Sequence, residues 1–229
     1  MKLTKLPLVA ALSLLMLSSN AWAQSTKRLI DEVNPFIGTS NFGTTNPGAV
    51  VPNGLMSITP FNVSGSPELN KFDKDKRWWS TPYTADNKFF SGFSHVNLSG
   101  VGCPELGSII VSASAGDLDV DYTHYGSAMS EEKAHPGYYS VQLDKHKIKA
   151  EVTATQRTAV SAFTFERGGK SNILVNLGLG LTNESGATVR FLNDSTIVGS
   201  KLMGTFCYAP QAVFNQYFAI RISRRAPAS

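Results

Sequence analysis

Short runs of alternating or clustered apolar residues follow one another along most of this chain. The run at 148–155, Ile-Lys-Ala-Glu-Val-Thr-Ala-Thr, has the two-residue period of a half-buried strand. Comparable runs, rich in Val, Ile, Thr, Tyr and Phe, predict further strands at 50–51, 55–59, 108–112, 118–122, 138–143, 159–165, 172–177, 184–192, 195–200 and 216–223. Turn signals such as Asp144-Lys-His and Arg167-Gly-Gly-Lys separate them. The pattern predicts an all-β protein folded as an antiparallel β-sandwich.

Two stretches of the chain contain more loop than the rest of this series. Prolines and glycines recur every few residues from 34 to 65, which excludes long helices there. Residues 64–87 are polar and irregular apart from Trp78, Trp79 and Tyr83, which predicts a long loop carrying aromatic side chains. Exposed tryptophans would offer flat apolar faces on which sugar rings stack. Alternatively, both tryptophans pin the loop to the core.

The segment 92–107, Gly-Phe-Ser-His-Val-Asn-Leu-Ser-Gly-Val-Gly-Cys-Pro-Glu-Leu-Gly, has the composition of a functional loop between strands. Its four glycines let a ligand or another backbone come close, while His95 and Asn97 offer directional polar groups. The alternative is a rigid structural corner whose polar groups satisfy only its own backbone.

The first 23 residues predict a secretory signal peptide. Lys2 and Lys5 precede an apolar run at 6–17, and Ala21-Trp22-Ala23 has the small-x-small pattern of a cleavage site. Neither that run nor any later stretch is long enough to span a bilayer as a helix. We expect residues 24–229 to form one exported domain, in a periplasm or outside the cell. Removal of the two lysines lowers the formal net charge from +4 to +2, too little to indicate nucleic-acid binding.

Cys103 and Cys207 are the two cysteines of a chain bound for an oxidising compartment. A disulfide between them would close a loop of about a hundred residues, worth up to roughly 4–5 kcal/mol in the chain-entropy model. Two separate buried thiols are the alternative. No Cys/His spacing in the chain resembles a zinc site.

The residues alone reveal no catalytic pair. Glycoside hydrolysis commonly uses two carboxylates across the scissile bond, and nothing in the spacing of Asp86 and Glu105 marks them as such a pair. Ser94 or Ser99 with His95 lacks the Gly-x-Ser-x-Gly pattern of a nucleophile elbow. The glycine-rich segment also lacks the Lys-Ser/Thr ending of a phosphate-binding loop.

Five segments of the chain carry a resemblance to a known family. They are 92–107 itself, Val-Asn-Pro-Phe-Ile-Gly-Thr at 33–39, Pro-Gly-Ala-Val-Val-Pro-Asn-Gly at 47–54, Glu-Lys-Ala-His-Pro-Gly-Tyr-Tyr-Ser-Val at 132–141, and Phe-Cys at 206–207 followed by Tyr-Phe at 217–218. In this order they resemble the N-terminal domain of glycoside hydrolase family 92, the calcium-dependent exo-acting α-mannosidases. The resemblance covers nearly the whole mature chain.

The resemblance implies a division of labour between two domains. Family members pack an N-terminal sandwich, supersandwich-like and galactose-mutarotase-like, on a larger (α/α)₆ helical barrel. That barrel supplies the acid, the base and most ligands of Ca²⁺, and hydrolysis of mannose-containing glycans inverts the anomeric centre. The sandwich contributes loops to the sugar pocket. Because none of the barrel is recognisable here, we expect a truncated chain with an incomplete sandwich, inactive by itself.

The resemblance also points to individual residues of the sugar pocket. It implies stacking by Trp79, a polar contact from His95 and places in the pocket for Asn97, Cys103 and Glu105. This chain has Asn97 where the family commonly has a second histidine, and Glu105 where it usually has Asp. Because an asparagine cannot titrate, these departures put the sugar or linkage preference in question.

Two other functions compete with this interpretation. One is a stand-alone carbohydrate-binding module that uses the Trp78/Trp79 loop as a stacking platform. The other is a secreted structural or adhesive β-sandwich without a sugar site.

Overall fold

The computed structural model describes residues 28–41, 43–65, 79–166, 168–182, 184–204, 207, 209 and 211–223. The chain divides into two compact units, Met1–Glu32 and Val33–Ser229. The described part of the first unit contains a 3-10 helix, η2 (Leu29–Glu32), beside an Arg28–Asp31 ion pair of 2.8 Å. The predicted signal peptide at 1–23 lies outside the described residues. No helix in the described ranges has the length and apolar character needed to cross a membrane.

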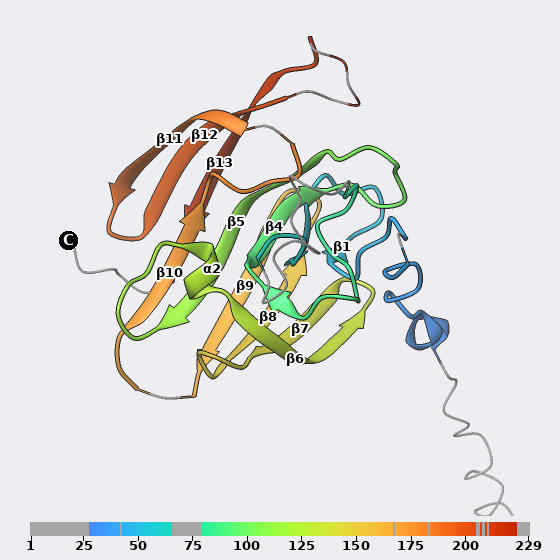
Figure 1. Cartoon of the computed structure of the whole chain (residues 1–229), viewed down its shortest axis with the longest axis horizontal. Coiled ribbons are helices and arrows are strands. Elements are labelled where there is room, and N and C mark those ends of the chain that lie inside the picture. The colour runs from blue at the N-terminus through green and yellow to red at the C-terminus, as the bar shows by residue number, and fades with distance from the viewer. Residues whose placement is uncertain are drawn as a thin grey trace, which may run out of the picture. The chain divides into compact units, whose positions relative to one another are not determined.

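The second unit consists of antiparallel strands in three sheets (Figure 1). The first sheet has the order β1-β2-β4-β5-β10: Ala49–Val50, Ser57–Phe61, Gly92–Asn97, Leu106–Ala115 and Ser171–Asn176. The second has the order β3-β6-β7-β8-β9: Phe89–Phe90, Ser127–His135, Tyr138–Leu143, Ile148–Ala154 and Ala159–Phe165. The third joins β11 (Glu184–Asn193), β12 (Thr196–Met203) and β13 (Phe214–Arg221). A single helical turn, α2 (Tyr122–Tyr125), precedes β6.

The first and second sheets pack face to face over the main core. On β8 the burial alternates residue by residue, so that Ile148, Ala150 and Val152 point inward and Lys149 points outward. The buried cluster that they join also holds Phe93 of β4 and residues of β1, β2, β5, β6 and β7. The predicted antiparallel β-sandwich is therefore confirmed.

The first sheet is buried on its other face as well. Ile58 of β2 belongs to the main core, whereas Phe61, three residues further along, belongs to a second cluster with Ile110 of β5 and Leu179. Successive side chains of a strand point to opposite faces, so residues an odd number apart line different faces. A strand buried on both faces loses its alternating pattern, as the eight consecutive buried positions of β5 show.

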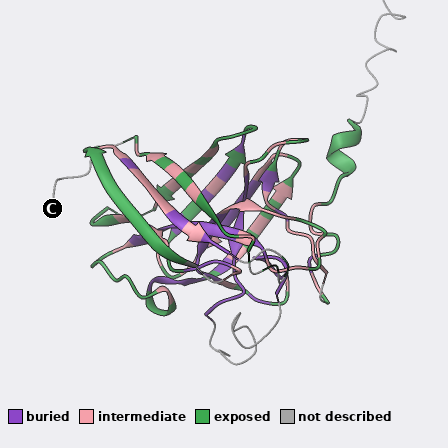
Figure 2. Cartoon of the chain, turned by 90° about the horizontal axis from the view of Figure 1, so that it is seen from above, coloured by how far each residue is buried: buried purple, intermediate pink, exposed green. Residues whose placement is uncertain are grey.

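The third sheet is the most exposed. The side chains of 185–193 on β11 are exposed throughout, and Figure 2 shows how this differs from the buried strands of the two larger sheets. Hydrogen bonds between described residues attach the third sheet to the rest of the unit: Lys201 Nζ donates to the Leu179 carbonyl at 3.4 Å, and Ser108 Oγ donates to Gln216 Oε1.

Ten of the predicted strand runs overlap observed strands, but the strand expected at 118–122 is wrong. Asp119 Oδ1 accepts a hydrogen bond from the Asp121 amide, and Asp121 Oδ1 accepts one from the Thr123 amide, both at 2.9 Å. These local bonds satisfy the backbone without a partner strand and make Asp121 the N-cap of α2. The segment 92–107 is also less of a loop than predicted, because β4 occupies 92–97 and β5 begins at 106.

Candidate functional site

The end of the β4–β5 pair has an irregular backbone. Phe93 pairs with Val111, but His95 pairs with Ser108, so Ile109 and Ile110 together lie opposite Ser94. This two-against-one arrangement is a β-bulge, a feature over-represented next to active sites. Ile109 has φ +51°, which is a genuine outlier for a β-branched residue. Backbone strain of this kind clusters at functional sites, and we take this end of the pair as the candidate site.

His95, on β4, contacts the bulge directly. Its Nδ1 lies 2.7 Å from the Ile109 carbonyl oxygen. A carbonyl oxygen can only accept, so Nδ1 carries the proton and Nε2 keeps its lone pair. Nε2 has no hydrogen-bond partner among the described residues. Burial lowers the pKa of this partly buried imidazole, and the bond to Ile109 offsets this only in part. His95 is thus a neutral ring whose Nε2 can accept a hydrogen bond.

Asn97 connects β4 to β2. Its Nδ2 donates to the carbonyls of Ser57 and Ser94, both at 3.1 Å, and its Oδ1 accepts from Ser94 Oγ at 2.7 Å. Its backbone amide donates to Ser57 Oγ at 2.7 Å. Both donors of the side-chain amide therefore serve the protein itself. A sugar contact by Asn97 stays a prediction, and only the remaining acceptor capacity of Oδ1 could make it.

The connection at 98–105 is fastened at several points. The Gly100 amide donates to the Thr44 carbonyl at 2.8 Å, and Asn46 Nδ2 donates to the Leu98 carbonyl at 3.2 Å. Cys103 forms a disulfide with Cys207, with their Cα atoms 5.3 Å apart. The alternative of two separate thiols does not hold in this structure.

Glu105 lies beside this disulfide and is 4% exposed. Its Oε1 accepts a hydrogen bond from the Cys207 amide. Burial raises the pKa of the Glu105 carboxyl, and the Cys207 amide lowers it in part. The contact holds the end of the loop to Cys207. The sugar contacts predicted for Glu105 and Cys103 stay predictions.

Trp79 lies in the core rather than on the surface. Its side chain is 8% exposed and packs in the second cluster with Phe61, Val63 and Ile110. This position matches the alternative in which a tryptophan pins the loop. Stacking on a sugar stays a prediction, for which the ring offers little surface. Trp78 lies outside the described residues.

The structure therefore brings His95, Asn97 and Ser94 together on β4 and ties Cys103 and Glu105 to residue 207. The sequence did not indicate Ser57 or Ile109, which complete this arrangement. Ser57 is one of many serines, and a bulge depends on strand pairing, which the order of residues does not display.

Comparison with known proteins assigns the family. The model of the glycosyl hydrolase family 92 N-terminal domain matches residues 32–229, which is most of the chain. The chain belongs to glycosyl hydrolase family 92.

Solved structures of family 92 agree with this assignment. The α-mannosidase BT3965 of Bacteroides thetaiotaomicron is 29% identical, with a TM-score of 0.73, both alone and in complex with mannoimidazole. The glycosyl hydrolase ccman5 is 26% identical with a TM-score of 0.64. The matches cover 87% and 84% of this chain but 26% of each relative. A protein of Arthroderma benhamiae, described as an uncharacterized secreted glycosidase, is 29% identical over 178 residues, or 72% of this chain and 21% of its own length. The chain thus spans about a quarter of the length of these relatives.

The described ranges contain no cluster of side chains that could bind the calcium ion expected of family 92. There, no three His, Cys, Asp or Glu side chains come together in a way that could hold a metal ion. Calcium prefers six to eight oxygen ligands. The described residues do not fit the ion.

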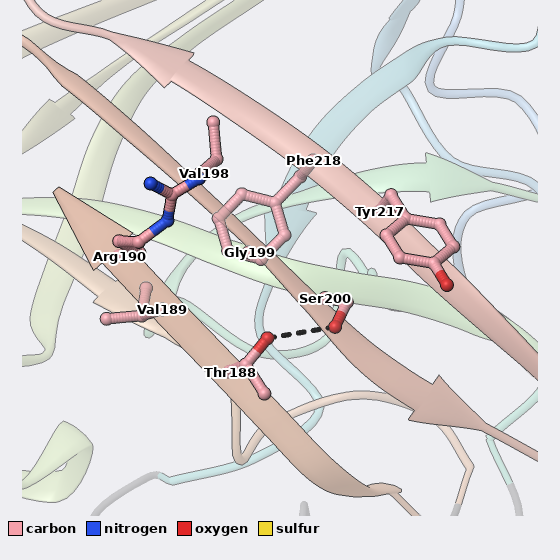
Figure 3. Close-up of a pocket in the computed structure, with 8 residues that line it drawn as sticks. All are labelled: Thr188, Val189, Arg190, Val198, Gly199, Ser200, Tyr217 and Phe218. Atoms are coloured by element: carbon pink, nitrogen blue, oxygen red, sulfur yellow. Dashed lines mark hydrogen bonds between the residues drawn. The ribbon is translucent and has the colours of Figure 1, made fainter. Parts of the chain in front are cut away.

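A concave feature lies on the third sheet, away from these residues in sequence. A shallow hollow of about 490 Å³ is lined by side chains of β11, β12 and β13, including Thr188, Ser200 and Tyr217 (Figure 3). The Thr188 and Ser200 hydroxyls are 2.9 Å apart and hydrogen-bonded. None of the residues lining it is an acid or a histidine, so it offers no group for acid–base catalysis.

Proposed function

We propose that this chain is the N-terminal part of an exported family 92 α-mannosidase that removes terminal α-mannose from glycans with inversion. The observation that carries the proposal is the likeness to α-mannosidase BT3965, at 29% identity and a TM-score of 0.73. In that protein the matched region is a quarter of the chain. We therefore assign the acid, the base and most calcium ligands to the part of such a protein that lies outside the match.

The β4–β5 end supports a role in forming the sugar pocket. Among the described residues no hydrogen-bond partner meets the acceptor nitrogen of His95, and sugar hydroxyls are hydrogen-bond donors. The bonds from Asn97 to β2, the disulfide at Cys103 and the contact of Glu105 hold the surrounding backbone in place. Groups fixed in this way lose little entropy on binding, which favours recognition.

Activity of the purified chain tests where the chemistry lies. We expect no hydrolysis of an aryl α-mannoside, with or without calcium, because the proposal places the reactive carboxylates elsewhere. Clear calcium-dependent turnover by the pure chain would refute it.

A chimera tests the contribution to the pocket. Residues 33–223 would replace the matching region of α-mannosidase BT3965, and activity on an aryl α-mannoside would be measured. We expect an active chimera in which His95→Ala lowers kcat/KM about five- to thirtyfold, the loss of roughly one hydrogen bond of 1–2 kcal/mol. His124→Ala is the matched control, because that side chain is 66% exposed on another part of the unit. Equal effects of both substitutions would argue against the role of His95.

No observation on the described residues favours the stand-alone carbohydrate-binding module, since Trp79 is largely buried. Calorimetry with mannose-containing oligosaccharides separates the two functions. Specific binding by the chain alone that is lost in Trp79→Ala, with the fold retained, would favour the module.

Export is part of the proposal. It rests on the predicted signal peptide and on the Arthroderma benhamiae relative, which is described as secreted. Sequencing the N-terminus of the exported protein checks it: we expect the mature chain to begin after Ala23. An intact Met1 on the exported protein would contradict the prediction. Location in a periplasm or outside the cell would follow from fractionation.

A further inference from the structure

The bulge at Ile109 suggests a role for a residue that the family resemblance did not single out. In a regular antiparallel pair, backbone carbonyls accept from the amides of the neighbouring strand. In a β-bulge one extra residue drops out of this pairing. Here the Ile109 carbonyl oxygen lies 2.7 Å from Nδ1 of His95.

We propose that Ile109 is a positioning residue, whose bulged peptide holds His95 in the Nδ1-protonated tautomer and thereby presents Nε2 as a hydrogen-bond acceptor. The use of that acceptor for a sugar hydroxyl rests on the proposed function. The tautomer itself does not depend on it.

The backbone of Ile109 makes this arrangement costly. A β-branched residue at φ +51° is strained and persists only where its surroundings fix it. The Ile109 side chain is 5% exposed, so packing supplies this constraint. A glycine would adopt the same φ without strain but would lack the buried side chain. The isoleucine therefore ties the direction of the carbonyl to the packing of the sheet.

A second histidine provides an internal reference. His146 Nε2 lies 2.8 Å from the Tyr125 carbonyl, and its Nδ1 accepts from the Ala115 amide at 3.4 Å. By the same reasoning His146 carries its proton on Nε2. The two rings should therefore show opposite tautomers in one spectrum.

The test is a long-range ¹H–¹⁵N correlation spectrum of the ¹⁵N-labelled mature chain at neutral pH. We expect His95 to be protonated on Nδ1 and His146 on Nε2. Ile109→Val keeps the branched side chain and the bulge and should leave both patterns unchanged. Deletion of Ile109 restores one-to-one pairing between Phe93–His95 and Ser108–Val111, and should release His95 into a tautomer mixture while His146 stays the same.

The proposal is overturned if wild-type His95 is protonated on Nε2, or if the folded deletion variant retains the Nδ1 tautomer. Should the deletion variant fail to fold, the exchange rate and the contacts of the His95 Nδ1 proton in the wild type test the proposal instead. A slowly exchanging proton with nuclear Overhauser contacts to the Ile109–Ile110 peptide supports the proposal, and its absence counts against it. In a separate arm, mannoimidazole is added to the BT3965 chimera. An unchanged His95 Nε2 shift would count against the sugar contact while leaving the tautomer result intact.

Discussion

The hydroxyl of Tyr83 donates a hydrogen bond of 2.8 Å to Oε2 of Glu132, and so ties the segment after Trp79 to β6. Tyr139 of β7 donates to the same oxygen at 2.7 Å, while Lys88 pairs with Oε1. Neither tyrosine exposes any measurable surface. Glu132 is directed toward them by a second bulge, at which Glu131 has φ +51°. Burial raises the pKa of both tyrosines well above the usual range, and the Glu132 charge raises it further, so the hydroxyls remain donors.

Removing one partner of this network should be costly. We expect Tyr83→Phe to lower the free energy of unfolding by about 1.5–3 kcal/mol, since it deletes a bond to a charged acceptor. Glu132→Ala should cost about 3–5 kcal/mol, because it leaves two buried hydroxyls without an acceptor. Urea unfolding at neutral pH measures both. The matched control is Tyr138→Phe, which removes the bond to the more exposed Glu151 and should cost less than about 1 kcal/mol. Equal losses in the free energy of unfolding for Tyr83→Phe and Tyr138→Phe would show that burial does not strengthen the bond to Glu132.

The disulfide should contribute a large part of the stability. Cys103 and Cys207 are 104 residues apart, and closing such a loop is worth up to about 4–5 kcal/mol in the chain-entropy model. We expect the double substitution Cys103→Ser, Cys207→Ser to lower the urea midpoint strongly, as reduction of the wild type should. A reduced protein that unfolds at the same midpoint as the oxidised one would show that the bridge adds nothing.

Unfolding should depend on pH through His95. Burial lowers its pKa from the ordinary value of 6.5, so the unfolded state takes up a proton more readily than the folded state. The stability associated with the neutral ring is complete above the unfolded pKa and is lost as the pH falls from there through the folded pKa. Measured at pH about 8 and about 5, the wild type should lose more stability than His95→Gln. Parallel pH profiles for the two proteins would contradict the lowered pKa.

Gly48 is fixed by its surroundings rather than by its backbone angles. A Cβ atom at this position would lie 2.4 Å from the Ile58 carbonyl oxygen and 2.4 Å from Thr59 Cβ, both on β2. Because these atoms belong to a paired strand, Gly48→Ala should destabilise the fold by about 1–3 kcal/mol or more. Gly102→Ala is the control: a Cβ there meets nothing within 4 Å, and we expect a change of at most about 0.5–1 kcal/mol. Thermal unfolding compares the two, and a neutral Gly48→Ala would show that β1 can move away from β2.

The amino-acid sequence by itself determined the fold class, most of the strands and the family. Alternation such as that of β8 is a local property, because a half-buried strand must place apolar residues two apart. The order of the family segments along the chain is likewise read from the sequence alone. Tertiary structure decided the rest. The pairing of Cys103 with Cys207, the burial of Trp79 and the contact of His95 with the Ile109 carbonyl depend on residues far apart in the chain. The error at 118–122 has a different origin: its apolar residues alternate as in a strand, but local hydrogen bonds that the Asp119 and Asp121 side chains accept satisfy the backbone without a partner strand.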